Sequence, residues 1–149
     1  MHPVLFADID GVFHPDDAAR MELNGDTWQA VGEQLFCWAP LLWQIIEPHN
    51  VHIVIHSTWR YSYALDELRD FFPIVLRHRI YAVTQHGARH ESILQYVETP
   101  GVEDFIVLDD MPQEFPLAWD RLVVCDGKQG LANVEVRERI RRFLENATC

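Results

Sequence analysis

The sequence predicts an α/β protein with a three-layer, Rossmann-like fold, in which helices cover both faces of a mainly parallel five-stranded sheet. Two observations predict it. Five short apolar runs are continuous rather than alternating, as in strands buried on both faces. Helical patterns lie between these runs, which is typical of parallel sheets. The expected strands are Val4–Ala7, His52–Ile55, Ile80–Val83, Phe105–Leu108 and Leu122–Val124.

Each connection between these strands shows helical apolar spacing. In the first, Thr27 is the expected N-cap of a helix that places Trp28, Val31 and Leu35 on one face. A proline then restarts this helix as Leu41–Glu47. The other helices are expected over residues 61–72, 89–97 and 136–144.

The composition favours one domain over residues 1–149. A chain of this length with 48% hydrophobic residues can build a single core. The 23 Asp and Glu against 12 Lys and Arg give a formal net charge of −11. Because such a surface repels phosphate backbones and anionic lipids, nucleic acid is a disfavoured partner.

Membrane and disulfide patterns are weak in this sequence. The longest apolar run, 36–46, is too short to cross a bilayer, and the first residues lack the core of a signal peptide. We therefore expect a cytoplasmic protein with no membrane partner. The three cysteines, Cys37, Cys125 and Cys149, lack the spacing of a disulfide framework or a zinc site.

Polar residues follow four of the five expected strands. Because ligands bind beyond the carboxyl ends of parallel strands, these residues are candidates for one site. Clustered carboxylates repel one another unless a cation joins them, and oxygen ligands without His or Cys suit Mg²⁺. The four segments are Asp8-Ile9-Asp10-Gly11, His56-Ser57-Thr58, Asp109-Asp110 and Cys125-Asp126.

Three of these segments together resemble the haloacid-dehalogenase (HAD) superfamily of phosphohydrolases. Leu5 to Val12 is similar to its first motif, Val54 to Arg60 to its second and Phe105 to Asp110 to its fourth. The motifs stand in the right order on expected strand ends, so the resemblance covers nearly the whole chain. The sequences Ser-Thr-Trp-Arg and Leu-Asp-Asp most resemble those of small HAD domains in RNA-repair proteins.

The resemblance implies a phosphatase mechanism. Asp8 would be the nucleophile, forming an aspartyl-phosphate, and Asp10 the acid and base. Mg²⁺ would be bound by the Asp8 carboxylate, the Asp10 backbone carbonyl and Asp110, with Asp109 as a further ligand or as a group behind the ligands. Phosphoryl oxygens would be bound by Ser57, with Thr58 as the alternative.

The third motif of the family, a basic residue that is usually Lys, has no lysine at its position here. Arg89 is the best positional match because it opens the helix before the fourth-motif strand. An arginine can neutralise the charge of a phosphate and bind it through two parallel hydrogen bonds. The only lysine, Lys128, follows the fifth strand and would reach the site only if its loop folded back.

The spacing of the motifs leaves no room for a full cap domain, so we expect an open site, with the loop of Phe13, His14, Asp16 and Asp17 as a small flap. Arg60 is expected to pair with a strand-end carboxylate. Three alternatives stay open: a nucleotide or polynucleotide-end phosphatase, a catalytically degenerate HAD protein, and a receiver-like module that binds a metal or a phosphate. A receiver would carry its acceptor Asp after the third strand, where this chain has Thr84 and Gln85.

Overall fold

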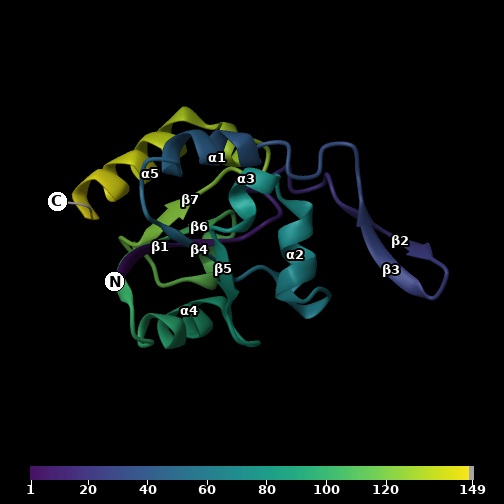
Figure 1. Ribbon diagram of the computed structural model, residues 1–149, viewed down its shortest axis with the longest axis horizontal. Helices are drawn as coiled ribbons and strands as arrows, with labels where there is room; N and C mark the ends of the chain where they lie inside the picture. Colours follow the sequence, from purple (N-terminus) through teal and green to yellow (C-terminus); the bar gives the residue numbers. More distant parts are fainter. Residues whose placement is uncertain (148–149) are drawn as a thin grey trace.

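The computed structural model, which describes residues 1–147, contains a five-stranded sheet in the order β5-β4-β1-β6-β7 (Figure 1). All neighbouring strands of this sheet are parallel, which confirms the predicted α/β, Rossmann-like fold. Every expected apolar run lies in a strand. The strands are β1 (His2–Ala7), β4 (His52–Ile55), β5 (Ile80–Val83), β6 (Val102–Asp109) and β7 (Leu122–Val124).

Helices cover both faces of the sheet. α1 (Ala39–Ile46) and α5 (Val134–Ala147) lie on one face, and α4 (Arg89–Val97) lies on the other (Figure 1). The central strand β1 serves both sides, because Leu5 and Ala7 belong to one buried cluster and Val4 and Phe6 to another. Successive side chains of a strand point to opposite faces. This double burial explains why the apolar runs are continuous.

The expected helix of Trp28, Val31 and Leu35 is wrong. Residues 20–31 form an antiparallel hairpin of β2 (Arg20–Asn24) and β3 (Thr27–Val31), which projects from the body at the end opposite the N-terminus (Figure 1). Thr27 is therefore a strand residue and not an N-cap. The apolar spacing misled because Trp28 is 61% exposed and packs in no core. Gly25, at φ 64, supplies the turn after Asn24.

The helix expected over residues 61–72 is divided. A 3₁₀ turn, Thr58–Tyr61, is followed by α2 (Leu65–Phe71) and the short α3 (Ile74–Arg77). Both α2 and α3 add buried leucines to the larger core, which α1 and α5 also line. The expected helices at 41–47, 89–97 and 136–144 are confirmed within a few residues.

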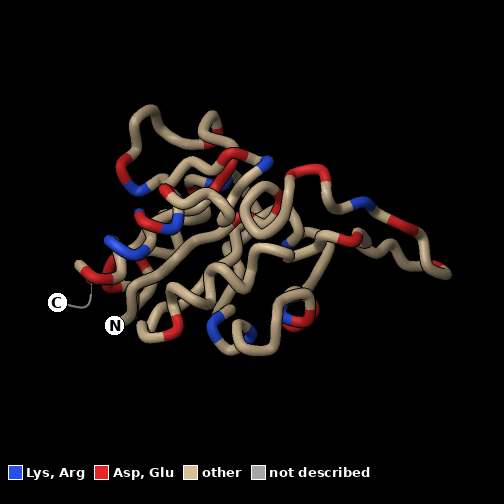
Figure 2. The backbone as a smooth tube through the Cα atoms, turned by 90° about the horizontal axis from the view of Figure 1, so that it is seen from above, with Lys and Arg blue, Asp and Glu red and all other residues tan. Residues whose placement is uncertain are grey.

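Charges and cysteines add two further observations. Acidic positions are spread over the backbone from α5 to the hairpin, and basic positions lie among them (Figure 2). Cys37 and Cys125 are free thiols, and Cys149 lies outside the described residues. Within residues 1–147, no helix has both the length and the apolar character needed to cross a membrane.

The buried face of β1 supports a stability prediction. Leu5→Ala removes a side chain that is 0% exposed in the larger core, so it should lower the free energy of unfolding by about 2–5 kcal/mol. Leu117→Ala is the matched control, because Leu117 is fully exposed and its loss should change stability by less than about 0.5 kcal/mol. Urea unfolding of both variants measures the difference, and equal losses would contradict this account of the core.

Candidate functional site

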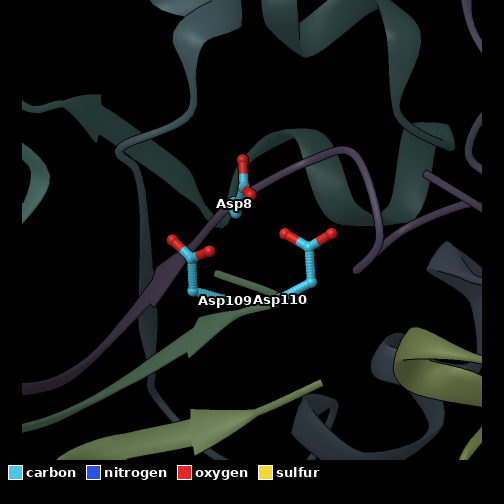
Figure 3. Close-up of side chains that lie close together, drawn as sticks. All are labelled: Asp8, Asp109 and Asp110. Carbon is cyan, nitrogen blue, oxygen red and sulfur yellow. The ribbon is translucent and has the colours of Figure 1, made fainter. Parts of the chain in front are cut away.

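Three carboxylates meet at the carboxyl edge of the sheet. Asp8 directly follows β1, while Asp109 ends β6 and Asp110 comes next (Figure 3). Each offers an oxygen atom, and these three oxygens all lie within 4.8 Å of one another. The parallel pairing of β1 with β6 causes this meeting, because Ala7 lies opposite Leu108 in the register. The set could hold a divalent cation.

A close approach by Gly11 shapes the wall of this cluster. The residue has φ 79, in the left-handed region that favours glycine. A Cβ atom at this position would lie 2.2 Å from Oδ2 of Asp110. The glycine therefore lets the chain turn sharply after Asp10 and leaves the space that the Asp110 carboxylate occupies.

Arg89 joins two of the carboxylates. Its Nη1 donates to Oδ2 of Asp8 at 2.8 Å and to Oδ2 of Asp109 at 2.7 Å. Burial alone would lower the pKa of Arg89, but the charges of Asp8 and Asp109 outweigh it and raise the pKa. The structure thus brings Arg89, the expected substitute for the missing lysine, to the proposed nucleophile.

Asp109 is the most enclosed member of the cluster. Beyond Arg89, its Oδ2 contacts Nε2 of His56 at 2.7 Å, and its Oδ1 accepts the N–H of Met111 at 2.9 Å. Burial would raise the pKa of Asp109, yet the hydrogen bond from His56 and the charge of Arg89 lower it. Both oxygens of Asp109 are thus hydrogen-bonded, and its side chain is buried, whereas Asp8 and Asp110 line the cleft.

Asp110 behaves differently because it faces carboxylates more than cations. Burial, the charge of Asp8, a hydrogen bond with Asp8 and the charge of Asp109 raise the pKa of Asp110 to about 7. Burial and the charge of Asp109 likewise raise the pKa of Asp8. Besides burial, the proximity of the Asp8, Asp109 and Asp110 carboxylates is the cause of both upward shifts in pKa, and a Mg²⁺ ion would relieve this repulsion. The donor set therefore fits Mg²⁺.

The side chain of Asp10 stands outside this cluster. Its Oδ1 contacts Nε2 of His14 at 2.8 Å, and its Oδ2 accepts the indole N–H of Trp59 at 2.9 Å. The sequence predicted His14 in a flap and gave Trp59 no role at the site. The spacing of four residues between Asp10 and His14 is the one sequence feature that could have linked this pair.

The second motif contributes two hydroxyls in different environments. Thr58 is exposed and lines the cleft beside Asp8. Ser57 is buried, and its Oγ accepts the N–H of Trp59 at 3.2 Å as the N-cap of the 3₁₀ turn. A serine hydroxyl that accepts one bond can still donate another.

The expected ion pair of Arg60 is wrong. Its guanidinium donates to backbone carbonyls instead, among them those of His56, Ser57 at 2.9 Å and Gly87 at 2.9 Å. These bonds tie the end of β4 to the loop that precedes α4. Arg60 therefore supports the wall of the cleft on which Arg89 stands.

An open cleft of about 530 Å³ contains Asp8, Asp10 and Asp110. A larger hollow, about 760 Å³, lies between β7 and α5, and Asp126 is the one strand-end candidate among the residues that line it. Lys128 does not reach Asp8, because its Nζ pairs with Asp16 at 2.7 Å and Asp17 at 3.4 Å. The full lining of the cleft is Asp8, Asp10, Asp16, Thr58, Arg60, Tyr61, Gly87, Ala88, Arg89, Asp110, Met111 and Glu114.

The expected flap is only partly confirmed. Asp16 lines the cleft, but Phe13 and His14 are completely buried beneath the site. The projecting element is the hairpin β2–β3 instead. Sequence reasoning missed it because its exposed apolar residues imitate a helical period.

A comparison with known families identifies the family of the chain. The family described as the HAD domain in Swiss Army Knife RNA repair proteins matches residues 4–136. The chain belongs to this family. The match includes all three motif segments and every candidate site residue named above. No curated protein matches the chain.

The raised pKa of Asp110 predicts a pH-dependent stability of the HAD domain. Asp110 binds its proton more tightly folded than unfolded, so its contribution to stability is present below about pH 4 and is lost as pH rises through about 7. In a metal chelator at pH 8, Asp110→Asn should stabilise the protein by about 1 kcal/mol, or about 3 °C in Tm. This advantage should shrink at pH 5.

Thermal melting at the two pH values measures this effect. Asp120→Asn is the matched control, because Asp120 is exposed and lies away from the cluster, and it should show no such pH dependence. Added Mg²⁺ should reverse the order of wild type and Asp110→Asn. A variant that is less stable than wild type in chelator at pH 8 would contradict the repulsion between these carboxylates.

The approach of Gly11 predicts a steric effect on metal binding. Gly11→Ala should weaken Mg²⁺ binding at least about tenfold, because its Cβ would overlap Asp110. Gly25→Ala is the matched control: it has the same left-handed backbone but nothing within 4 Å of the new Cβ. Calorimetric titration with Mg²⁺ distinguishes them, and equal affinities would show that the overlap with Asp110 is unimportant.

Proposed function

We propose that this HAD domain is a Mg²⁺-dependent phosphatase that hydrolyses a phosphomonoester through an aspartyl-phosphate on Asp8. One observation carries the proposal. A single open cleft contains a carboxylate cluster, a second and separate carboxylate, and a guanidinium bonded to the cluster. This combination supplies a nucleophile, an acid and a counter-charge for phosphate within one site.

The chain offers two groups that would hold the metal in front of Asp109. These are the carboxylates of Asp8 and Asp110, and the HAD resemblance adds the backbone carbonyl of Asp10. When bound, Mg²⁺ supplies the positive charge that allows an anionic phosphate to approach a carboxylate. Asp109 would orient the site from behind through its bonds to Arg89, His56 and Met111.

The proposed reaction has two steps. In the first, an Asp8 oxygen attacks phosphorus, the bond from phosphorus to the ester oxygen breaks, and Asp10 gives its proton to that leaving oxygen. In the second, the Asp10 carboxylate takes a proton from water, whose oxygen attacks phosphorus. The bond from Asp8 to phosphorus then breaks, so that inorganic phosphate leaves and Asp10 is protonated again.

Arg89 and the second motif would bind the phosphoryl oxygens. Arg89 stands 2.8 Å from the proposed nucleophile, so its charge would face the phosphate as well as Asp8. Ser57 and Thr58 follow β4 at the same edge of the sheet, with Thr58 exposed in the cleft. Because Arg89 supplies the missing third-motif charge, a catalytically degenerate site is the weaker proposal.

The substrate class is a phosphorylated molecule of unknown size. The family description names RNA repair, which makes a nucleotide or an RNA end a narrower candidate. The net charge of −11 disfavours a long nucleic acid, although an end group would need few contacts with its backbone. We therefore retain polynucleotide-end hydrolysis as a second candidate. A receiver-like module is disfavoured because no acid follows β5.

Hydrolysis of 4-nitrophenyl phosphate tests the proposal. Wild type should show turnover that requires Mg²⁺ and stops with a chelator. Asp8→Asn should lower the rate by at least about 10³-fold, because it removes the nucleophile. Asp10→Asn should lower it by about 10²–10⁴-fold, because it removes the base that activates water in the second step. Release of 4-nitrophenol gives the rates.

Two further results complete this test. The exposed variant Asp120→Asn should keep the wild-type rate. Acid-quenched wild type, but not Asp8→Asn, should carry the phosphoryl group on the peptide of Asp8. A panel that adds alkyl phosphates, a nucleotide and an RNA 3′-phosphate ranks the substrates. Wild type without Mg²⁺-dependent turnover on the whole panel would defeat the enzyme in favour of a binding module.

A further inference from the structure

His14 is a buried histidine whose hydrogen bonds fix its tautomer. The residue is 0% exposed and lies between Asp10 and the backbone of Phe36. Its Nδ1 accepts the N–H of Phe36 at 3.1 Å. Because a backbone N–H can only donate, Nδ1 carries no proton, so in the neutral ring the proton is on Nε2. Nε2 therefore donates its hydrogen to Oδ1 of Asp10, 2.8 Å away.

Trp59 holds the other oxygen of the same carboxylate. Its indole N–H, which is a donor only, reaches Oδ2 of Asp10 at 2.9 Å. Each carboxylate oxygen thus receives one fixed donor, so the plane of the carboxylate cannot rotate freely. The Asp10 side chain remains 36% exposed, which leaves the other lone pairs of its oxygens open to the cleft.

His14 is itself held by the backbone and the aromatic rings around it. The carbonyl of His14 accepts the N–H of Gly11 at 2.9 Å, which closes the turn between Asp10 and His14. The His14 ring packs edge-on against Phe36, with centroids 5.2 Å apart, and lies 5.7 Å from the ring of Trp59. Phe36 has φ 58, a conformation uncommon for a non-glycine residue. The chain therefore maintains an unusual backbone at the group that fixes the histidine.

We propose that His14 and Trp59 are positioning residues that hold the Asp10 carboxyl group toward the leaving oxygen. This inference rests on the proposed function, in which Asp10 protonates that oxygen as its bond to phosphorus breaks. A poor leaving group such as an alkoxide needs the proton, whereas 4-nitrophenolate leaves readily as an anion. Loss of either donor should therefore harm alkyl phosphates more than aryl phosphates.

The experiment compares kcat/KM for 4-nitrophenyl phosphate and a simple alkyl phosphate in the presence of Mg²⁺. This ratio reports the step in which the leaving group departs and is insensitive to the later hydrolysis on Asp8. Trp59→Phe and His14→Leu should each lose about tenfold more on the alkyl ester than on the aryl ester. His14→Gln, whose side-chain amide can donate a hydrogen bond from a similar place, should restore most of kcat/KM for the alkyl ester.

Two controls separate positioning from folding. Trp43→Phe removes an indole N–H from another partly buried tryptophan, which contacts His78 and Arg79. This variant should leave kcat/KM unchanged for both the aryl and the alkyl ester. Adding Trp59→Phe to Asp10→Asn should bring no further selective loss, because the group that it positions is already gone. Trp59→Phe keeps the aromatic packing, so it tests the inference even where His14→Leu fails to fold.

Nitrogen NMR of the free protein gives a readout that is independent of turnover. The ring of His14 should show a protonated Nε2 and an unprotonated Nδ1, and Asp10→Asn should perturb it. The opposite tautomer, or equal losses on the two esters in both donor variants, would overturn the inference while leaving the phosphatase proposal intact. Wild type without Mg²⁺-dependent hydrolysis would instead defeat the proposed function and, with it, this role for the two donors.

Discussion

The bonds from Arg89 to Asp8 and Asp109 make the carboxyl edge of the sheet electrostatically tenable. β1 and β6 lie side by side in the middle of the sheet, and both end in buried carboxylates. Without a cation between them, two such charges in a low-dielectric interior would strongly disfavour the folded state. Because Arg89 is the first residue of α4, these bonds also fix where that helix begins against the sheet.

The remaining repulsion falls on Asp110, and this gives the cluster an uneven character. Asp109 has donors on both oxygens and is well compensated, whereas Asp110 retains a pKa of about 7. The cluster thus has a fully hydrogen-bonded member, Asp109, in the interior and a poorly compensated member, Asp110, that lines the cleft. A cation that bound here would be favoured, because it would remove the existing repulsion between the carboxylates.

Much of this organisation could be predicted from the sequence, and the failures have physical causes. The strands were predictable because burial on both faces leaves continuous apolar runs, such as that ending at Ala7. The convergence of Asp8 with Asp110 followed from parallel topology. The hairpin at residues 20–31 was not predictable from spacing, because Trp28 is apolar without being buried. The contact between His14 and Phe36 uses a backbone N–H, which leaves no trace in side-chain chemistry.

That same contact has a consequence for how the chain can vary. His14 precedes the hairpin and Phe36 follows it, and the hydrogen bond between them closes the neck of this excursion. The segment from 15 to 35, which includes the hairpin, therefore leaves and rejoins the body beside Asp10, and Ala30 also attaches it to the main core. The exposed tip of the hairpin, around Gly25, could therefore change in length and composition while the bond between His14 and Phe36 stayed in place, without disturbing the groups proposed for the reaction.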